Sequence, residues 1–144
     1  VRTVIVEGNI IFRCNTTYGS NDTNSSFAWI SLGGNILVDP GVGNDPQSGI
    51  SKLSGIYVAI ARNGAGGQFR SIGDVTSQRI LRVEGSLYGY AKPLLDSRLY
   101  TRGTSAYEIL TAGTVISYSN RALVNPPPLL SEFLGNYNVE RVVR

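Results

Sequence analysis

The sequence predicts an all-β fold, a compact barrel or sandwich of roughly 8–10 short strands with at most one or two short helical turns near the C-terminus. Apolar, β-prone runs recur along the chain with turn residues between them. The 17 glycines and 6 prolines interrupt the chain often, and few segments show the period of an α-helix. The 144 residues suffice for one domain over residues 1–144, with candidate short arms at 1–6 and 139–144.

The N-terminal third contains two pairs of apolar runs. Residues 3–6 and 10–14 flank a Glu-Gly-Asn segment, which predicts either a hairpin or one strand with a glycine bulge. Residues 27–39 contain two apolar runs around Gly-Gly-Asn at 33–35, which predicts a second hairpin. The lone Cys14 is expected on a strand as a small hydrophobic residue. Long loops are expected at residues 15–26 and 40–49.

The remaining chain predicts further strands and few helical turns. Residues 4–10 and 81–87 share a similar pattern, which strands of this composition also produce by chance. The expected elements are a buried strand at 56–61, a turn at 63–67 followed by a strand at 68–72, an alternating strand within 75–92, a weak strand at 94–100, a helical turn or strand at 105–108, a hairpin over 113–124 turning at 119–120, and helical turns at 129–134.

The residue inventory argues against an enzyme. The chain has no histidine and one cysteine, so no Ser–His–Asp triad, Cys–His pair or Cys/His zinc site can form. The two lysines do not stand in a Ser-x-x-Lys motif, and the glycine-rich segment at 63–67 lacks a phosphate-binding fingerprint. The acidic loop residues do not have EF-hand spacing. We therefore expect no catalytic residue, no cofactor and no metal ion.

The charged residues favour contacts with other proteins. The net charge is +3, and 11 of the 13 basic residues are arginine, which is preferred over lysine in contacts. The arginines are scattered along the chain, so nucleic-acid binding is not expected. No apolar run is long enough to span a membrane, and no signal peptide is visible.

Eight residues are candidates for these contacts. Tyr88 and Tyr90 are expected on one strand face, where aromatic rings stack on sugars or fill a partner's pocket. The tail at 139–144 is expected either to close the domain's own sheet or to add a strand to another subunit. The candidate interaction residues are Arg2, Trp29, Tyr88, Tyr90, Arg98, Arg102, Arg141 and Arg144.

One segment carries a resemblance. The run Leu-Thr-Ala-Gly-Thr-Val-Ile-Ser at 110–117 resembles the Ala-Gly-Thr strand of small β-rich capsid decoration (cement) proteins of tailed phages. The resemblance implies a β-barrel or β-sandwich that trimerises over a capsid lattice.

These observations predict a non-enzymatic structural virion protein. It is expected to stabilise a capsid or similar large assembly through protein–protein contacts, to form a homo-oligomer, and to reside in the virion after synthesis in the host cytoplasm. The alternative is a carbohydrate- or receptor-binding β-module of the adhesin or fibre-head type, located outside the cell or at its surface. The loops at 15–26 and 40–49 and the tyrosines would then form the binding site.

Overall fold

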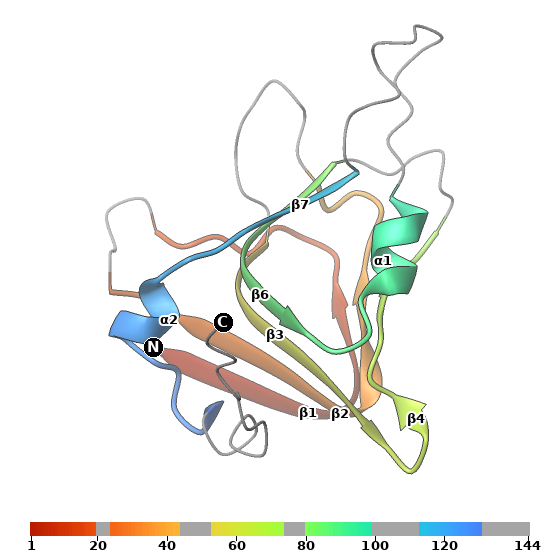
Figure 1. Cartoon of the computed structure of the whole chain (residues 1–144), viewed down its shortest axis with the longest axis horizontal. Helices are drawn as coiled ribbons and strands as arrows, with labels where there is room; N and C mark the ends of the chain where they lie inside the picture. Colours follow the sequence, from red (N-terminus) through yellow and green to blue (C-terminus); the bar gives the residue numbers. More distant parts are fainter. Residues whose placement is uncertain (20–23, 44–52, 74–79, 99–112, 131–144) are drawn as a thin grey trace, which may run out of the picture.

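A computed structural model describes residues 1–19, 24–43, 53–73, 80–98 and 113–130 (Figure 1). Candidate sites and elements at other positions lie outside the described residues. The elements are β1 (Arg2–Phe12), β2 (Phe27–Val38), β3 (Leu53–Arg62), β4 (Ala65–Gly66), β5 (Phe69–Ser71), β6 (Leu81–Tyr88), α1 (Lys92–Ser97), β7 (Thr114–Ser117) and α2 (Arg121–Val124).

The strands form one sheet whose spatial order follows the chain. The order is β1-β2-β3-β6-β7, and every neighbouring pair on this path is parallel. β5 pairs in parallel with β2, whereas the two-residue β4 pairs antiparallel with β3. Because each strand runs in the same direction as the one before it, the chain returns to its starting side after every strand. It therefore winds in successive coils, as Figure 1 shows for β1, β2 and β3.

The all-β prediction is confirmed, but the hairpin predicted over residues 27–39 is wrong. Those residues form the single strand β2, which pairs in parallel with β1 on both sides of Gly33-Gly34. The glycines bend the strand instead of reversing it. Residues 3–12 are likewise one strand, with a register shift between Gly8 and Ile10, and this confirms the second of the two alternatives. Residues 2–6 belong to β1 and are not a free arm. A barrel or sandwich is not confirmed by this parallel arrangement.

Asparagine side chains connect successive coils where the strands bend. The backbone N–H of Asn35 donates to Oδ1 of Asn9 at 2.7 Å, and the backbone N–H of Gln68 donates to Oδ1 of Asn35 at 3.1 Å. We call Asn9, Asn35 and Gln68 the corner ladder. Directly after it, residues 10–12, 36–38 and 69–71 pair as a second set of parallel segments.

The coils approach so closely at this corner that side chains are excluded. A Cβ atom on Gly34 would lie 2.1 Å from the carbonyl carbon of Gly8. Because no real Cβ contact is this short, the backbones of β1 and β2 would have to separate. Glycine is thus required at position 34 by the packing of one coil on the next.

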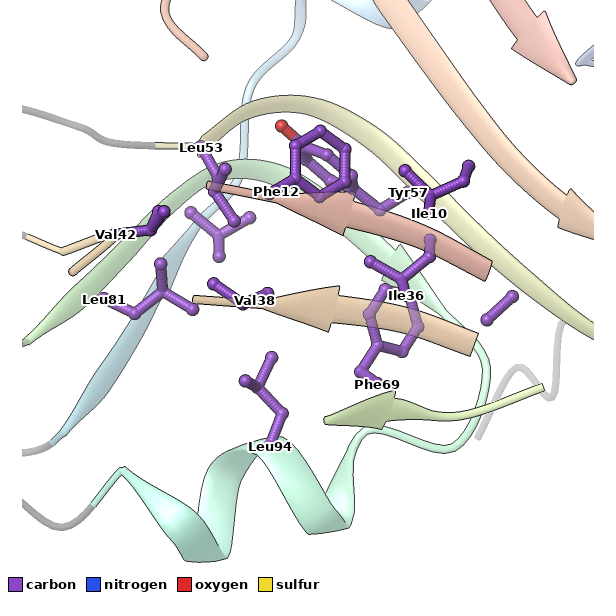
Figure 2. Close-up of a cluster of buried hydrophobic side chains, with 12 residues drawn as sticks. Ile10, Phe12, Ile36, Val38, Val42, Leu53, Tyr57, Phe69, Leu81 and Leu94 are labelled. Carbon is purple, nitrogen blue, oxygen red and sulfur yellow. The ribbon is translucent and has the colours of Figure 1, made fainter. Parts of the chain in front are cut away.

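The main core lies between the two sets of parallel segments. Figure 2 shows the apolar side chains of this main cluster converging, with Leu94 pointing into the cluster from α1. A second cluster lies on the outer face of β2 and β3, where Ala122 and Leu130 cover it. The main cluster contains Ile10, Phe12, Ile36, Val38, Val42, Leu53, Tyr57, Ala59, Phe69, Leu81, Val83 and Leu94.

Polar contacts hold the segment at residues 121–130 against the sheet. Ser26 Oγ donates to the carbonyl of Asn125, and Thr3 Oγ1 donates to the carbonyl of Pro128. The guanidinium of Arg121 lies 4.4 Å from the centroid of the Tyr18 ring, and its Nε is 4.0 Å from a carboxylate oxygen of Glu84. The segment therefore covers the outer face of the sheet.

The structure confirms some later elements and corrects others. The buried strand at 56–61 lies within β3, and Leu81 and Val83 are buried as the alternation within 75–92 predicts. The weak strand at 94–100 is wrong, because residues 92–97 form helix α1, with Pro93 in its first turn, and Leu94 packs into the core. The hairpin over 113–124 is also wrong, since β7 is followed by helix α2. Cys14 follows β1 and is exposed.

Substitution of Gly34 tests the close approach of the coils. We expect Gly34→Ala to lower the free energy of unfolding by about 3 kcal/mol or more, the upper end for overpacking. Gly41→Ala is the control, because a Cβ there meets only the carboxylate of Asp39 at 3.2 Å. Urea unfolding measures both, and equal stabilities of the two variants would contradict this packing.

Substitution of Asn35 tests the corner ladder. Asn35→Ala leaves the Gln68 amide without its acceptor, and we expect a loss of about 1–3 kcal/mol in unfolding free energy. Asn35→Asp keeps an oxygen at that position and should retain most of this stability. Chemical denaturation of both variants makes the comparison, and an Ala variant as stable as the Asp variant would exclude a role for the side-chain oxygen.

Candidate functional site

A cavity at the β1 end of the sheet gathers two of the predicted interaction residues. Arg2 and Trp29 both line it, and its volume is about 410 Å³. We call it the Trp29 cavity. Its lining residues are Arg2, Val4, Asn15, Thr16, Thr17, Phe27, Ala28 and Trp29.

The register of β1 and β2 builds one wall of the Trp29 cavity. Arg2 pairs with Phe27, and Val4 pairs with Trp29. Since alternate residues of a strand share a face, these four side chains lie on the same side of the sheet. The indole of Trp29 packs edge-on against Phe12 of the core, with ring centroids 5.3 Å apart. The cavity is therefore separated from Phe12 of the main core by the indole of Trp29.

The segment from Asn15 to Thr17 supplies the polar wall and is anchored to β3. The backbone N–H of Ser54 donates to the carbonyl of Thr16 at 2.7 Å. The phenol of Tyr57 donates to the carbonyl of Ser54 at 2.9 Å, so the hydroxyl of Thr16, 2.8 Å away, donates to the phenol oxygen. Sequence analysis treated this segment as part of a long loop and did not identify these residues.

Burial changes the acidity of the Tyr57 phenol beneath this wall. Desolvation raises its pKa well above the ordinary value of 10.0, and the hydrogen bond from Thr16 opposes that shift only in part. Desolvation also raises the pKa of Tyr18, whose ring stacks on Phe27 at a centroid distance of 5.2 Å. Tyr57 is therefore a neutral hydrogen-bonding group that fixes the position of Thr16.

The indole nitrogen of Trp29 is an unpaired donor buried beside the cavity. Nε1 is buried and has no hydrogen-bond partner among the described residues. Buried donors are nearly always paired in folded proteins, and an unpaired one costs about 1–3 kcal/mol.

The outer edge of β1 is a second feature at the same end of the sheet. Among the described residues, β1 pairs only with β2. The backbone N–H of Arg2 donates toward β2, to Ser26, at 3.0 Å. Because backbone groups alternate in direction along a strand, the amides of Thr3, Ile5 and Glu7 point away from β2. We call these three amides the free edge of β1.

Other predicted residues lie elsewhere, and two do not share the expected face. Tyr88 ends β6, whereas Tyr90 pairs with Gln68 beyond a bend at Gly89, where φ is +141°. The prediction that both rings lie on one strand is therefore wrong. Both remain exposed, at 43% and 55%.

Arg98 is a structural residue and not a surface contact. It is 1% exposed and donates to the carbonyls of Val42 at 2.5 Å and Asp39 at 2.7 Å. Burial lowers its pKa from 12.5 to about 10, although Asp39 opposes the shift. Its guanidinium thus holds the chain after β2 in place. Arg102, Arg141 and Arg144 lie outside the described residues.

Comparisons and residue searches give no functional assignment. No family model, curated protein or solved structure matches this chain. Within the described ranges, no group of three or more histidine, cysteine, aspartate or glutamate residues is placed to hold a metal ion. No helix in the described part of the chain is both long enough and apolar enough to cross a membrane. The Trp29 cavity and the free edge of β1 are therefore the candidate functional features of the described residues.

The raised pKa of Tyr57 predicts a pH dependence of stability. Above pH 10 the unfolded chain loses the Tyr57 proton while the native protein keeps it, so the free energy of unfolding falls with rising pH. Tyr57→Phe removes this contribution, and its stability should fall less steeply by about 1.4 kcal/mol per pH unit. Urea titrations at about pH 10.5 and about pH 11.5 measure the slopes, because the difference develops only above the unfolded tyrosine pKa of about 10.

The control for this pH dependence is Tyr118→Phe, which removes an exposed tyrosine. It should keep the slope of the unsubstituted protein. A Tyr57→Phe variant whose slope equals that of the control would mean that Tyr57 ionises equally easily in the folded and unfolded chains.

Proposed function

We propose that the chain is a non-enzymatic structural protein that builds or stabilises a capsid or similar large assembly, and that the free edge of β1 is where a second copy pairs. The observation that carries this proposal is an edge strand of 11 residues, β1, with no strand on its outer side in the described residues. Such an edge is a template for strand addition.

The side chains of β1 give its edge little protection. Edge strands usually avoid pairing through lysine, proline, short length or a covering segment. β1 contains neither lysine nor proline, and Ile5 and Ile11 are 38% and 47% exposed. Its Glu7 forms an exposed ion pair with Arg62 at 3.4 Å, and such pairs contribute little. These features favour association over a solvated edge.

The spacing of the free amides favours a second copy as the partner. The amides of Thr3, Ile5 and Glu7 are symmetric about Ile5. Antiparallel pairing of two β1 strands across a two-fold axis at Ile5 would satisfy all three amides in both copies. This pairing would also place the two exposed Ile5 side chains together, which removes apolar surface from water.

Composition supports the larger assembly and the virion location. Charged residues make up 16% of the chain, against about 25% in a typical soluble domain. Extensive contact surfaces are depleted in lysine and glutamate and enriched in arginine, as this chain is. The resemblance of residues 110–117 to tailed-phage decoration proteins points to a capsid as the assembly.

Light scattering during size exclusion, over a range of loading concentrations, tests the proposal. We expect the mass of the unsubstituted protein to rise above that of the monomer with concentration. Ile5→Lys should remain monomeric at every concentration, because it places two charges together at the axis.

The matched control is Leu95→Lys, which changes an exposed apolar residue on α1, away from β1. It should associate like the unsubstituted protein. A monomer at all concentrations in the unsubstituted protein, or association of Ile5→Lys with unchanged affinity, would overturn the proposal. Circular dichroism confirms that each variant is folded.

A further inference from the structure

The turn between β3 and β4 contains an asparagine that is followed by glycine. Of the 11 asparagines in the sequence, only Asn63 has this neighbour. Asn63 and Gly64 have φ values of +52° and +77°, the left-handed conformation that Asn-Gly adopts in two-residue hairpin turns. Both residues are exposed. Water therefore reaches the side-chain amide of Asn63 and the peptide group that follows it.

The peptide nitrogen of Gly64 is unhindered. Glycine has no Cβ atom, and one built at this position would meet nothing within 4 Å. The nitrogen can therefore approach the side-chain carbonyl carbon of Asn63 without a side chain in its way. Asn120 is also exposed, but it is followed by Arg121, whose side chain hinders the same approach.

The tip of this hairpin is held by few contacts. Strand β4 has only two residues, and the pair of Arg62 with Ala65 encloses the turn. Both residues of this pair are exposed, and segments with few buried contacts open locally at low free energy. Opening lets the backbone of Asn63 rotate, so that the Gly64 nitrogen reaches the side chain.

We propose that Asn63 is a site of spontaneous deamidation in the folded protein. The Gly64 nitrogen loses its proton and bonds to the side-chain carbonyl carbon of Asn63, and ammonia leaves as the bond to the side-chain amide nitrogen breaks. Water then opens the cyclic succinimide. Attack at the side-chain carbonyl gives aspartate, whereas attack at the backbone carbonyl gives isoaspartate. No electrons are transferred, and water is the only co-reactant.

The two products differ in how they fit this corner of the fold. Isoaspartate adds a carbon atom to the backbone of the turn, whereas aspartate changes only the side chain. A Cβ atom on Gly66 would lie 2.5 Å from the carbonyl carbon of Gly33, so β4 has no room to move toward β2. The chain then continues to Gln68, whose amide donates to Asn35 in the corner ladder. Isoaspartate at position 63 therefore displaces this part of the ladder, and aspartate leaves it in place.

Peptide mapping by chromatography and mass spectrometry, after incubation of the folded protein, tests the modification. We expect the peptide that contains Asn63 to gain aspartyl and isoaspartyl forms. The conversion should be faster at alkaline than at acidic pH, because the Gly64 nitrogen must lose its proton. The peptide that contains Asn120 is the internal control and should keep its amide through the same incubation.

Two variants separate the added backbone atom from the added charge. Urea unfolding of the incubated unsubstituted protein should show a new transition at lower urea concentration than the fresh protein. Asn63→Gly suits the same turn but has no side-chain amide, so incubation should not change its transition. Freshly prepared Asn63→Asp carries the charge without the extra atom and should unfold at the same urea concentration as the fresh unsubstituted protein.

Three results would overturn the proposal. The absence of acid products at Asn63 would exclude the site, and conversion of Asn120 at the same rate would remove the role of Gly64. Incubated protein that contains isoaspartate and unfolds like the Asn63→Asp variant would remove the effect on the corner ladder. None of these measurements depends on pairing at the free edge of β1, which light scattering tests separately.

Discussion

The fold depends on the contact that Asn35 makes with the coils on either side. Its amide donates to the side chain of Asn9, and its own side chain accepts from the amide of Gln68. Beside it, Gly34 lies against the backbone of Gly8, with no room for a Cβ atom. These contacts set the register of three coils at once. The two sets of parallel segments, and the core between them, follow from that register.

Both candidate functional features lie at β1, on the outer side of which the described residues place no further strand. In the described chain, the strand pairs on one side only, so its outward amides are left for another strand. Val4 and Trp29 border the cavity at the same end of the described strands. The outer face is different, because the segment that contains Arg121 and Leu130 covers it. The candidate functional features therefore lie at the β1 side of the described sheet and not on its outer face.

The sequence predicts the strands better than their pairing. The alternation of Leu81 and Val83 and the apolar run at 56–61 are local patterns, and the structure confirms both strands. The sequence Gly33-Gly34-Asn35 is compatible with a tight hairpin and with a bent strand. The close approach of Gly34 to the distant Gly8 accompanies the bent strand that the structure contains. Gly-Asn-Ile at 8–10 and 34–36 and Gly-Gln-Phe at 67–69 are the repeat that marks the coils. Their unequal spacing of 26 and 33 residues hides it.

Arg2 and Trp29 could be selected by residue type, whereas Thr16 becomes part of the site only through its distant contacts with Ser54 and Tyr57.

Amide hydrogen exchange in β1, measured residue by residue at low and high protein concentration, tests the central claim most directly. The amide of Val4 points toward β2 and should be protected at both concentrations, whereas the amide of Ile5 should become protected only as concentration rises. Exchange at Ile5 that is independent of concentration would contradict pairing through this edge. An unprotected Val4 amide would contradict the parallel β1–β2 pairing itself.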